Sequence, residues 1–524
     1  TSTVLAQAWK EDTDPGNLLA SLFELFGERS HSCSSLIQFK DSFSINQTED
    51  VSLFCNENAG LKSYPKTNSW KEGEVPSKVS HLSKLVSLDL SGWADEQVTI
   101  DKHALEGLVH NLTEVRHLFL DGINMSSVNA HVFMNLSSSL RSLSLAGCDL
   151  QGKFPKIIFD LPNLNLTHLD LSWNQLSGQI PLSILNLTQL EYLKISENSL
   201  EGSIPDEVTA FPNLIYLYLD NNLLNGTFPS WLYTAPSLKD IDLSQNQFRG
   251  HIKEFQSKSL ELISLKNNNL QGPLPSLIFQ LLNLTLLFLS SNNLSGVIEF
   301  SMFSNLPNLQ LLDLSYNSLS LTSNTTSTVN LRSLVLSSCN LSESPQFLKG
   351  LKSLESLDLS CNNIEGKIPK WMQEVGNGFL TYLNVSHNSL TEVEHFPWNN
   401  IAVLDLSSNL IRGNLPIPAL TVNVFLISNN SFNGEVSSLI CNATYLEILD
   451  LSHNNLSGII PQCFGNLSNS LQFLNLKKNK FYGTIPPTFA KGCRLTNFNL
   501  NGNLLEGPLT PSILNCNGLE VLDL

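Results

Sequence analysis

The chain has 524 residues, of which 42% are hydrophobic, 8% aromatic and 15% charged, with a formal net charge of −17 at pH 7. This length exceeds the size at which one hydrophobic core keeps growing, so several domains or a repeat array are expected. The acidic balance gives no general attraction for phosphate backbones, and nucleic acid is not an expected partner.

Residues 1–32 are expected to form an irregular N-terminal segment. The apolar stretch from Leu18 to Phe26 is broken by Glu24 and follows acidic residues, so it does not fit a secretion signal, and Thr1 is not a start methionine. No run of eighteen apolar residues occurs, so no membrane span is predicted. Either a signal has been removed or the sequence is an incomplete gene model.

A repeating unit of about 24 residues, reading LxxLxxLxLxxNxLxGxIP, recurs from Leu82 to the end. One copy runs from Leu187 to Pro205 and the next from Phe211 to Pro229. About nineteen copies fill residues 76–524, and the last one is cut off at Leu524. The period predicts a solenoid in which each unit buries its leucines against its neighbours.

Each position of the unit has a physical role. The LxL triplet alternates as a short strand does, so one strand per coil should stack into a parallel sheet on a concave face. Gly permits a bend, and Pro stops the following segment from extending a ladder. An amphipathic helix is excluded because Gly and Pro recur in phase with the leucines. The repeated asparagine should turn inward and bond neighbouring backbone; its copies include Asn174, Asn198, Asn222, Asn246, Asn292, Asn454 and Asn503.

Two groups of motifs resemble known plant proteins. LDLSWNQLSGQIP (Leu169 to Pro181) and LDLSHNNLSGIIP (Leu449 to Pro461) resemble the plant-specific leucine-rich repeat, in which LSGxIP adds a second short strand. CSSLIQFKDSFSIN (Cys33 to Asn46) and SYPKTNSW (Ser63 to Trp70) resemble the N-terminal cap of plant receptor-like proteins, especially the Cf class of disease-resistance receptors. The resemblance covers nearly everything from Cys33 onward. It implies an α/β solenoid, a right-handed, curved and twisted superhelix.

The resemblance also implies a function. Proteins of this class stand at the extracellular face of the plasma membrane, recognise a pathogen-derived protein or peptide, and signal through a partner receptor kinase. The chain departs from the family in two ways. The cap expected over residues 33–75 is incomplete, because Trp70 runs almost directly into Val75 and Pro76 without the family's further cysteines. The family's C-terminal part is also missing, so the membrane is reached only through a segment absent from this sequence.

Nine cysteines are distributed unevenly along the chain. Cys493 and Cys516 hold similar places on consecutive coils, where like positions lie about 5 Å apart, so a disulfide is predicted. Cys441 and Cys463 form a second predicted pair with poorer register. Cys148 and Cys339 replace the ladder asparagine and should be buried thiols. The states of Cys33, Cys55 and Cys361 are left open.

The sequence holds sixteen Asn-x-Ser/Thr sites, many of which arise simply because the repeat is rich in NLS and NLT. Those on convex loops would carry glycans if the chain is secreted. The candidates are Asn46, Asn111, Asn124, Asn135, Asn165, Asn186, Asn225, Asn283, Asn293, Asn324, Asn340, Asn384, Asn429, Asn442, Asn455 and Asn466.

No catalytic, metal-binding or phosphate-binding motif is present, so neither an enzyme nor a cofactor or metal is predicted. Histidines such as His387 and His453 fall beside the ladder, and aspartates such as Asp313 and Asp358 are the x of LxL. Aromatic residues beside charges favour a binding surface, although a long solenoid shows such clusters by chance. The candidate concave residues are Trp173, Tyr192, Lys194, Tyr216, Tyr218, Asp240 and Asp242. Tyr216→Ala with Tyr218→Ala is expected to weaken ligand binding without lowering thermal stability.

Four functions are compatible with these observations. The first is the ectodomain of a receptor-like protein in plant defence. The second is a soluble inhibitor of a cell-wall-degrading enzyme, similar to the polygalacturonase-inhibiting proteins, which have far fewer repeats. A receptor-kinase ectodomain and a non-functional gene fragment are the others. The ligand itself is not encoded in the repeat pattern, because it depends on concave residues that vary on one scaffold.

Overall fold

The computed structural model describes residues 75, 79, 83–92, 98–128, 130–159, 164–207, 210–322, 329–396 and 398–524. The chain divides into two compact units, one ending at Ser177 and one beginning at Gly178, each described here by itself. The expected irregular segment and, apart from Val75, the expected cap lie outside the described residues. Cys33, Cys55, Asn46 and Asn324 therefore lie outside them too.

The first unit contains four strands in one parallel sheet, joined in chain order. They are β1 (Ser87–Asp89), β2 (His117–Phe119), β3 (Ser142–Ser144) and β5 (His168–Asp170). A second pairing joins β4 (Gln151–Lys153) to β6 (Gln175–Gln179). Among the described residues of this unit, the helical segments between the strands are α4 (Lys102–Asn111), η5 (Ala130–Asn135) and α5 (Lys156–Phe159). Asp101 caps α4 by accepting a hydrogen bond from the amide of Ala104 at 2.7 Å.

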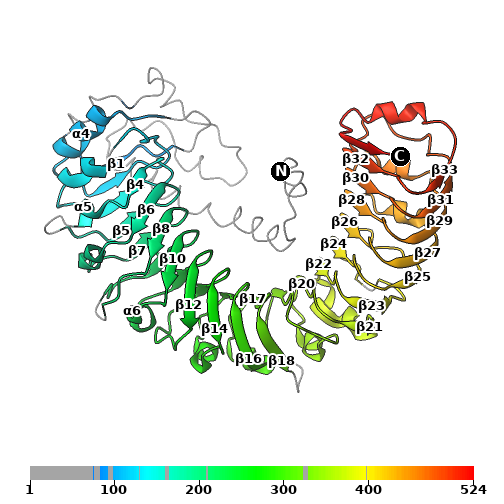
Figure 1. Cartoon of the computed structure of the whole chain (residues 1–524), viewed down its shortest axis with the longest axis horizontal. Helices are drawn as coiled ribbons and strands as arrows, with labels where there is room; N and C mark the ends of the chain where they lie inside the picture. The colour runs from blue at the N-terminus through cyan, green and yellow to red at the C-terminus, as the bar shows by residue number, and fades with distance from the viewer. Residues whose placement is uncertain are drawn as a thin grey trace, which may run out of the picture. The chain divides into compact units, whose positions relative to one another are not determined.

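The second unit repeats the same plan along a curve, with the LxL strands on its inner side (Figure 1). Each strand has three residues, and in all but the last the middle residue is a buried apolar side chain such as Leu217 or Ile241, whereas Leu522 of the last strand is 39% exposed. Adjacent strands pair in parallel and in register, Leu193 opposite Leu217 for example. The strands are β7 (Tyr192–Lys194), β9 (Tyr216–Tyr218), β11 (Asp240–Asp242), β13 (Leu262–Ser264), β15 (Leu286–Phe288), β17 (Leu311–Asp313), β19 (Ser333–Val335), β20 (Ser356–Asp358), β22 (Tyr382–Asn384), β24 (Val403–Asp405), β26 (Val424–Leu426), β28 (Ile448–Asp450), β30 (Phe473–Asn475), β32 (Asn497–Asn499) and β34 (Val521–Asp523).

The LSGxIP segments form the second set of short strands that the plant-type repeat implies. Their glycine has a positive φ, 86° at Gly458, and a side chain there would meet Glu435 Cγ at 2.7 Å. One run is β8 (Ser199–Gly202), β10 (Leu223–Gly226), β12 (Gln247–His251), β14 (Asn269–Gly272), β16 (Asn293–Glu299) and β18 (Ser318–Thr322). The other is β21 (Glu365–Lys367), β23 (Ser389–Glu392), β25 (Arg412–Asn414), β27 (Ser431–Glu435), β29 (Asn455–Ile459), β31 (Lys480–Gly483) and β33 (Leu504–Leu505).

The two runs are separated at one degenerate repeat. There the sequence reads CNLSESP (Cys339 to Pro345), and Glu343 stands where most repeats have glycine. The missing glycine does not by itself explain the interruption, because Leu321 and Glu392 occupy the same repeat position in the strands β18 and β23.

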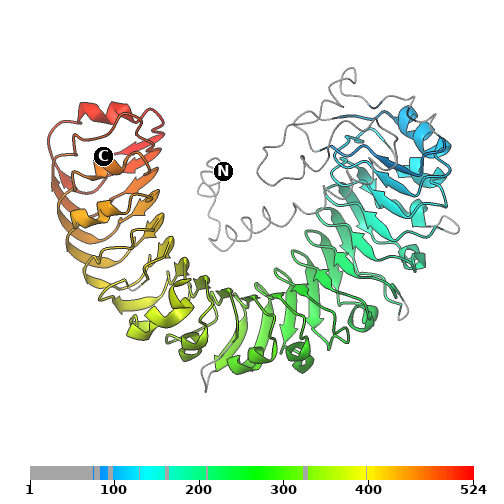
Figure 2. The same cartoon turned by 180° about the vertical axis from the view of Figure 1, so that it is seen from behind.

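Short helical segments return the chain on the outer side of the curve, which Figure 2 shows from behind. Several start directly after the repeat's proline, as η6 follows Pro181 and α6 follows Pro229. They are η6 (Leu182–Asn186), α6 (Ser230–Thr234), η7 (Ser276–Gln280), η8 (Phe300–Asn305), η9 (Gln346–Gly350), η10 (Lys370–Gly378), η11 (Ser438–Asn442), α7 (Phe464–Leu467) and η12 (Pro511–Asn515). Phenylalanines thicken the core beneath them, and Phe300 stacks on Phe347 at 3.7 Å between ring centroids.

The predicted asparagine ladder is confirmed. Asn246 is typical: its Oδ1 accepts from the amide of Leu224 in the preceding coil at 3.0 Å, and its Nδ2 donates to the carbonyls of Leu219 and Leu243 at 2.9 and 3.3 Å. Cys148 and Cys339 replace this residue as predicted and are buried free thiols, each donating to a carbonyl of the preceding coil. The ladder thus satisfies buried backbone groups that the strands leave unpaired.

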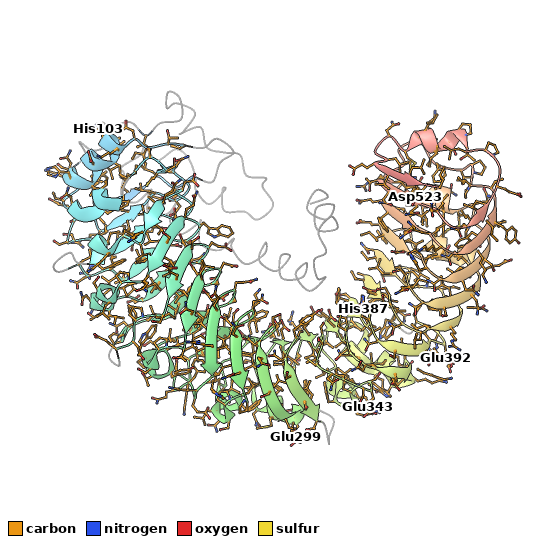
Figure 3. All side chains as sticks on the ribbon, in the orientation of Figure 1. His103, Glu299, Glu343, His387, Glu392 and Asp523 are labelled. Carbon is orange, nitrogen blue, oxygen red and sulfur yellow. A yellow bond between two sulfur atoms is a disulfide. The ribbon has the colours of Figure 1, made fainter. Side chains whose placement is uncertain are left out.

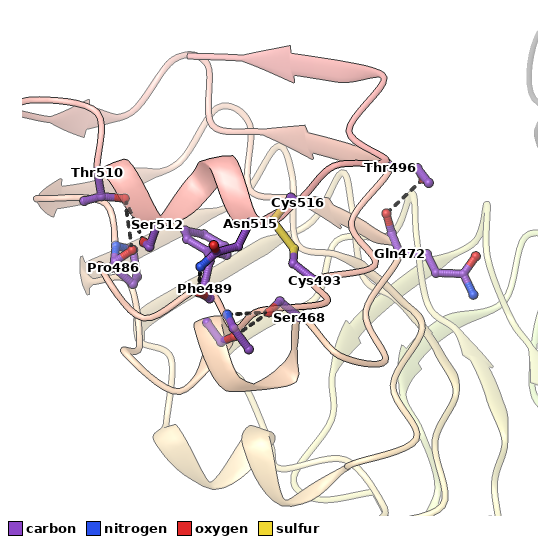
Figure 4. Close-up of a disulfide and its surroundings, with 12 residues drawn as sticks. Ser468, Gln472, Pro486, Phe489, Cys493, Thr496, Thr510, Ser512, Asn515 and Cys516 are labelled. Carbon is purple, nitrogen blue, oxygen red and sulfur yellow. Dashed lines mark hydrogen bonds between the residues drawn. A yellow bond between two sulfur atoms is a disulfide. The ribbon is translucent and has the colours of Figure 1, made fainter.

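Both predicted cysteine pairs are bonded. Cys493 and Cys516 join the last two coils with Cα atoms 4.5 Å apart (Figure 4), and Cys441 and Cys463 join an earlier pair of coils at 6.1 Å. Beside the terminal bridge, Asn515 Nδ2 donates to the carbonyl of Phe489 at 2.7 Å. Cys361 is exposed.

Candidate functional site

Six of the seven predicted binding residues lie together on three adjacent strands, β7, β9 and β11. Register places Tyr192 beside Tyr216 and Tyr216 beside Asp240 in one row, and Lys194 beside Tyr218 and Tyr218 beside Asp242 in the next. All six side chains are partly exposed. We call this two-by-three arrangement the tyrosine–aspartate block. It lies on the strand face of the second unit, the side on which His387 is also found, whereas Glu299 and Glu343 lie on the outer side (Figure 3).

The tyrosines of the block contact one another and the neighbouring carboxylate. The ring centroid of Tyr192 lies 6.0 Å from that of Tyr216 and 5.9 Å from that of Tyr218. The hydroxyl of Tyr218 donates to Asp240 Oδ2 at 2.9 Å. Burial and this acceptor raise the pKa of Tyr218, so it stays a neutral donor.

This bond corrects the expected outcome of the double substitution. Tyr218→Ala would leave the partly buried carboxylate of Asp240 without its donor, so a loss of thermal stability is now expected. The side-chain hydroxyl of Tyr216 makes no hydrogen bond with the described residues. Tyr216 alone is therefore the residue whose removal separates binding from stability.

Asp240 and Asp242, on the β11 side of the block, lie where burial disfavours their charged forms. Burial raises the pKa of Asp242 to about 7, with the neighbouring carboxylate of Asp220 adding to the rise. Burial likewise raises the pKa of Asp240. Hydrogen bonds from Ser244 offset part of this effect at Asp242, whose carboxylate accepts from the Ser244 amide at 2.9 Å.

Two lysines lie near these carboxylates but do not neutralise them. Lys239 pairs with Glu261 on the next strand at 2.8 Å. Lys194 has no carboxylate within 4.0 Å among the described residues, and it lies on β7, two strands from Asp242. Glu261, Lys239 and Asp220 were not among the predicted residues. Their positions directly beside the LxL triplets would have indicated that they lie next to the block.

Trp173 belongs to the first unit. It follows β5 in a left-handed conformation with φ 55°, immediately before the ladder residue Asn174, and its side chain is 52% exposed. The same turn position carries His387 and His453 in the second unit, both exposed and both with positive φ. These histidines are therefore beside the ladder, as the repeat pattern predicts.

Most of the repeated aspartates of LDLS are buried although they occupy outward strand positions, and Asp313 is partly buried. Asp358, 3% exposed, accepts from the amide of Ser360 at 2.8 Å, and Asp405 accepts from that of Ser407 at 2.8 Å. Asp170, Asp313 and Asp450 cap the same turn. Their role in the described coils is to fix the turn after each strand.

A second surface feature was not predicted. The first residues of β22, β24, β26, β28 and β30 pair in register across adjacent strands. All are partly exposed and mainly apolar, which makes a continuous strip, here called the apolar row. It consists of Tyr382, Val403, Val424, Ile448 and Phe473.

The glycan candidates fall mostly outside the inner sheet. Asn384 is the exception and is withdrawn, because it is only 2% exposed and its amide donates to Asp358 at 3.2 Å. Asn111 and Asn124 are partly exposed. The exposed sites, none of which lies in an inner-sheet strand of the described chain, are Asn135, Asn165, Asn186, Asn225, Asn283, Asn293, Asn340, Asn429, Asn442, Asn455 and Asn466.

Comparisons with known proteins agree with this architecture. Leucine rich repeat family models match residues 139–161, 165–187, 188–248, 329–390, 445–467 and 470–491. The ectodomain of the Arabidopsis thaliana receptor kinase GASSHO1/SCHENGEN3, solved with CASPARIAN STRIP INTEGRITY FACTOR 2, is similar over 84% of this chain and 56% of its own, with a TM-score of 0.67 and 29% identity. The Arabidopsis receptor kinase HAESA, solved with the peptide hormone IDA and the co-receptor SERK1, is similar over 86% of this chain and 80% of its own, with a TM-score of 0.57 and 27% identity.

Curated relatives are receptor-like proteins of Arabidopsis thaliana. Receptor-like protein 54 is 40% identical over 36% of this chain and 23% of its own length, and receptor like protein 27 is 40% identical over 50% and 33%. The matches thus span a third or less of those relatives. Within the described ranges, no helix has the length and apolar character needed to cross a bilayer. Repeat models, solved ectodomains and curated relatives converge, and the chain is a plant-type leucine-rich-repeat protein related to the receptor-like proteins.

Proposed function

We propose that the chain is the ligand-recognising part of a cell-surface receptor-like protein, which binds a peptide or protein on the inner strand face and acts in plant defence through a partner receptor kinase. The observation that carries this proposal is the tyrosine–aspartate block. It presents partly exposed aromatic and charged side chains, the residue types that dominate binding hot spots, on a rigid sheet.

Two further observations support it. Exposed glycan candidates in the described chain lie off the inner strands, and none lies on β7, β9 or β11, which carry the block. The similar solved ectodomains carry peptide ligands, and one carries a co-receptor. The resemblance of the N-terminal motifs to the Cf class suggests a pathogen-derived ligand and a place at the plasma membrane.

The test introduces a photo-crosslinking amino acid at Tyr216 in the secreted chain, with the same amino acid at Leu182 as control, since Leu182 is 61% exposed on an outer helical segment. Peptide fractions from infected tissue should crosslink at position 216 and not at 182. A synthetic copy of the captured peptide should then trigger a defence response in leaf cells that express the full-length protein, and recruit a receptor kinase.

Three results would contradict the proposal: equal crosslinking at both positions, no crosslinking at either, or a captured peptide that elicits no response. Capture of a cell-wall-degrading enzyme, with loss of that enzyme's activity, would establish the inhibitor function instead.

A further inference from the structure

The aspartate end of the tyrosine–aspartate block has binding capacity that the chain itself does not use. Tyr218 donates to Asp240 Oδ2 at 2.9 Å, whereas Asp240 Oδ1 has no hydrogen-bond partner among the described residues. Asp242 and Asp220 lie close enough for their charges to oppose each other. Lys239, the nearest lysine in sequence, is held by Glu261 at 2.8 Å. A cation arriving here would therefore meet negative charge that Tyr218 and Lys239 compensate only in part.

The tyrosine beside Asp240 supplies a second component of a cation site. Tyr216 is partly exposed and lies in register with Asp240 on the next strand, and its hydroxyl makes no hydrogen bond with the described residues. An aromatic face next to a carboxylate attracts a guanidinium or ammonium group through the ring quadrupole and the charge together. Tyr192 supports the ring at 6.0 Å between centroids.

The opposite end of the block has the opposite charge. Lys194 lies on β7, and no carboxylate of the described residues pairs with it. Two strand spacings separate β7 from β11, about 10 Å, which three residues of an extended peptide span. A small free cation would satisfy only one end of this arrangement, whereas a peptide with groups of both signs would satisfy both.

We infer that the block recognises a polypeptide segment carrying a basic side chain, Arg or Lys, over Tyr216 and Asp240 and an acidic side chain about three residues away over Lys194. This inference rests on the proposed function and specifies the chemistry of its ligand. The separated charges also fix the direction in which the peptide crosses the strands.

The probe is the capped peptide acetyl-Glu-Ala-Ala-Arg-amide, titrated into the purified chain and followed by ligand-observed NMR. Replacing Arg by its neutral isostere citrulline should weaken binding at least about tenfold. In the Asp240→Asn variant the two peptides should bind alike, because the charge they distinguish is gone. Lys194→Gln should in the same way abolish the preference for Glu over Gln in the probe.

Asp313→Asn serves as the matched control, because Asp313 lies on the same face three strands beyond β11. It should leave every preference intact. Equal binding of the Arg and citrulline peptides, a preference that survives Asp240→Asn, or no binding of either peptide up to about 10 mM would overturn the inference. Such a result would leave the proposed function standing, since another part of the inner face could hold the ligand. If the crosslinking test failed while the probe peptide bound as expected, the proposed receptor function would be refuted, whereas the preference of the block for a peptide with Arg and Glu would stand.

Discussion

At the scale of single residues, each ladder asparagine makes several hydrogen bonds to the backbone from a buried or partly buried position. Asn454 accepts from the amide of Phe432 at 3.0 Å and donates to the carbonyls of Ile427, Leu451 and Ser452 at 2.9 to 3.2 Å. Asn454→Ala leaves these groups unpaired, and a loss of about 2 kcal/mol or more in unfolding free energy is expected by chemical denaturation.

The adjacent residue provides the control for that substitution. Asn455 is exposed at the start of β29, so Asn455→Ala should change the unfolding free energy by less than about 0.5 kcal/mol. Equal losses for the two variants would show that the ladder bonds contribute nothing specific.

The buried carboxylates predict a pH dependence of stability. Burial raises the pKa of Asp405 to about 6, above the ordinary value near 3.9, so between these values the folded chain holds a proton that the unfolded chain has released. The stabilisation is complete below about pH 4 and is lost as pH rises through about 6. Thermal midpoints should therefore fall between about pH 4 and 6, and Asp405→Asn should make the fall shallower. Identical slopes for the two proteins would contradict this assignment.

At the scale of elements, the terminal disulfide closes the last coils. Cys493 and Cys516 are separated by 23 residues, a loop whose cross-link is worth about 3 kcal/mol. Replacing both by serine should accelerate amide exchange in β31, β32 and β34. Exchange in β7, β9 and β11 should not change, because those strands share no contact with the bridge. Faster exchange along the entire chain would show that the bridge supports more than its own coils.

The same scale shows which structural elements can be predicted from the sequence. The period predicts the inner strands, the ladder and both cysteine pairs, because each depends on the spacing of the repeat, and the resemblance to the plant-specific repeat implies the second strands. The interruption at Glu343 and the burial of Asp358 were not predicted. The burial of Asp358 depends on the adjacent coils, whose Ser337 and Asn384 donate to its carboxylate from about a whole repeat away.

The residues of the tyrosine–aspartate block were predicted because they flank the inward leucines of the LxL triplets. The hydrogen bond between Tyr218 and Asp240 was not predicted, because it depends on the side-chain conformations of two adjacent coils.

At the scale of the molecule, each coil contacts chiefly the coils before and after it, so stability is close to a sum of nearest-neighbour terms. Asn454→Ala should therefore raise amide exchange around β26 to β31 and leave β7 to β11 unchanged, as hydrogen-exchange mass spectrometry can measure. A uniform rise across the second unit would instead indicate one cooperative core.

Because the inner strands keep one register, adjacent coils of the second unit are separated by one constant strand spacing. Gain or loss of one complete coil between the tyrosine–aspartate block and the apolar row would not change which side chains of the remaining coils point outward. It would change the separation of the two surfaces by one strand spacing, about 4.8 Å. Unequal crossing-over between repeats would thus change, in discrete steps, the length of ligand that can contact both surfaces at once. No substitution within either surface would be required.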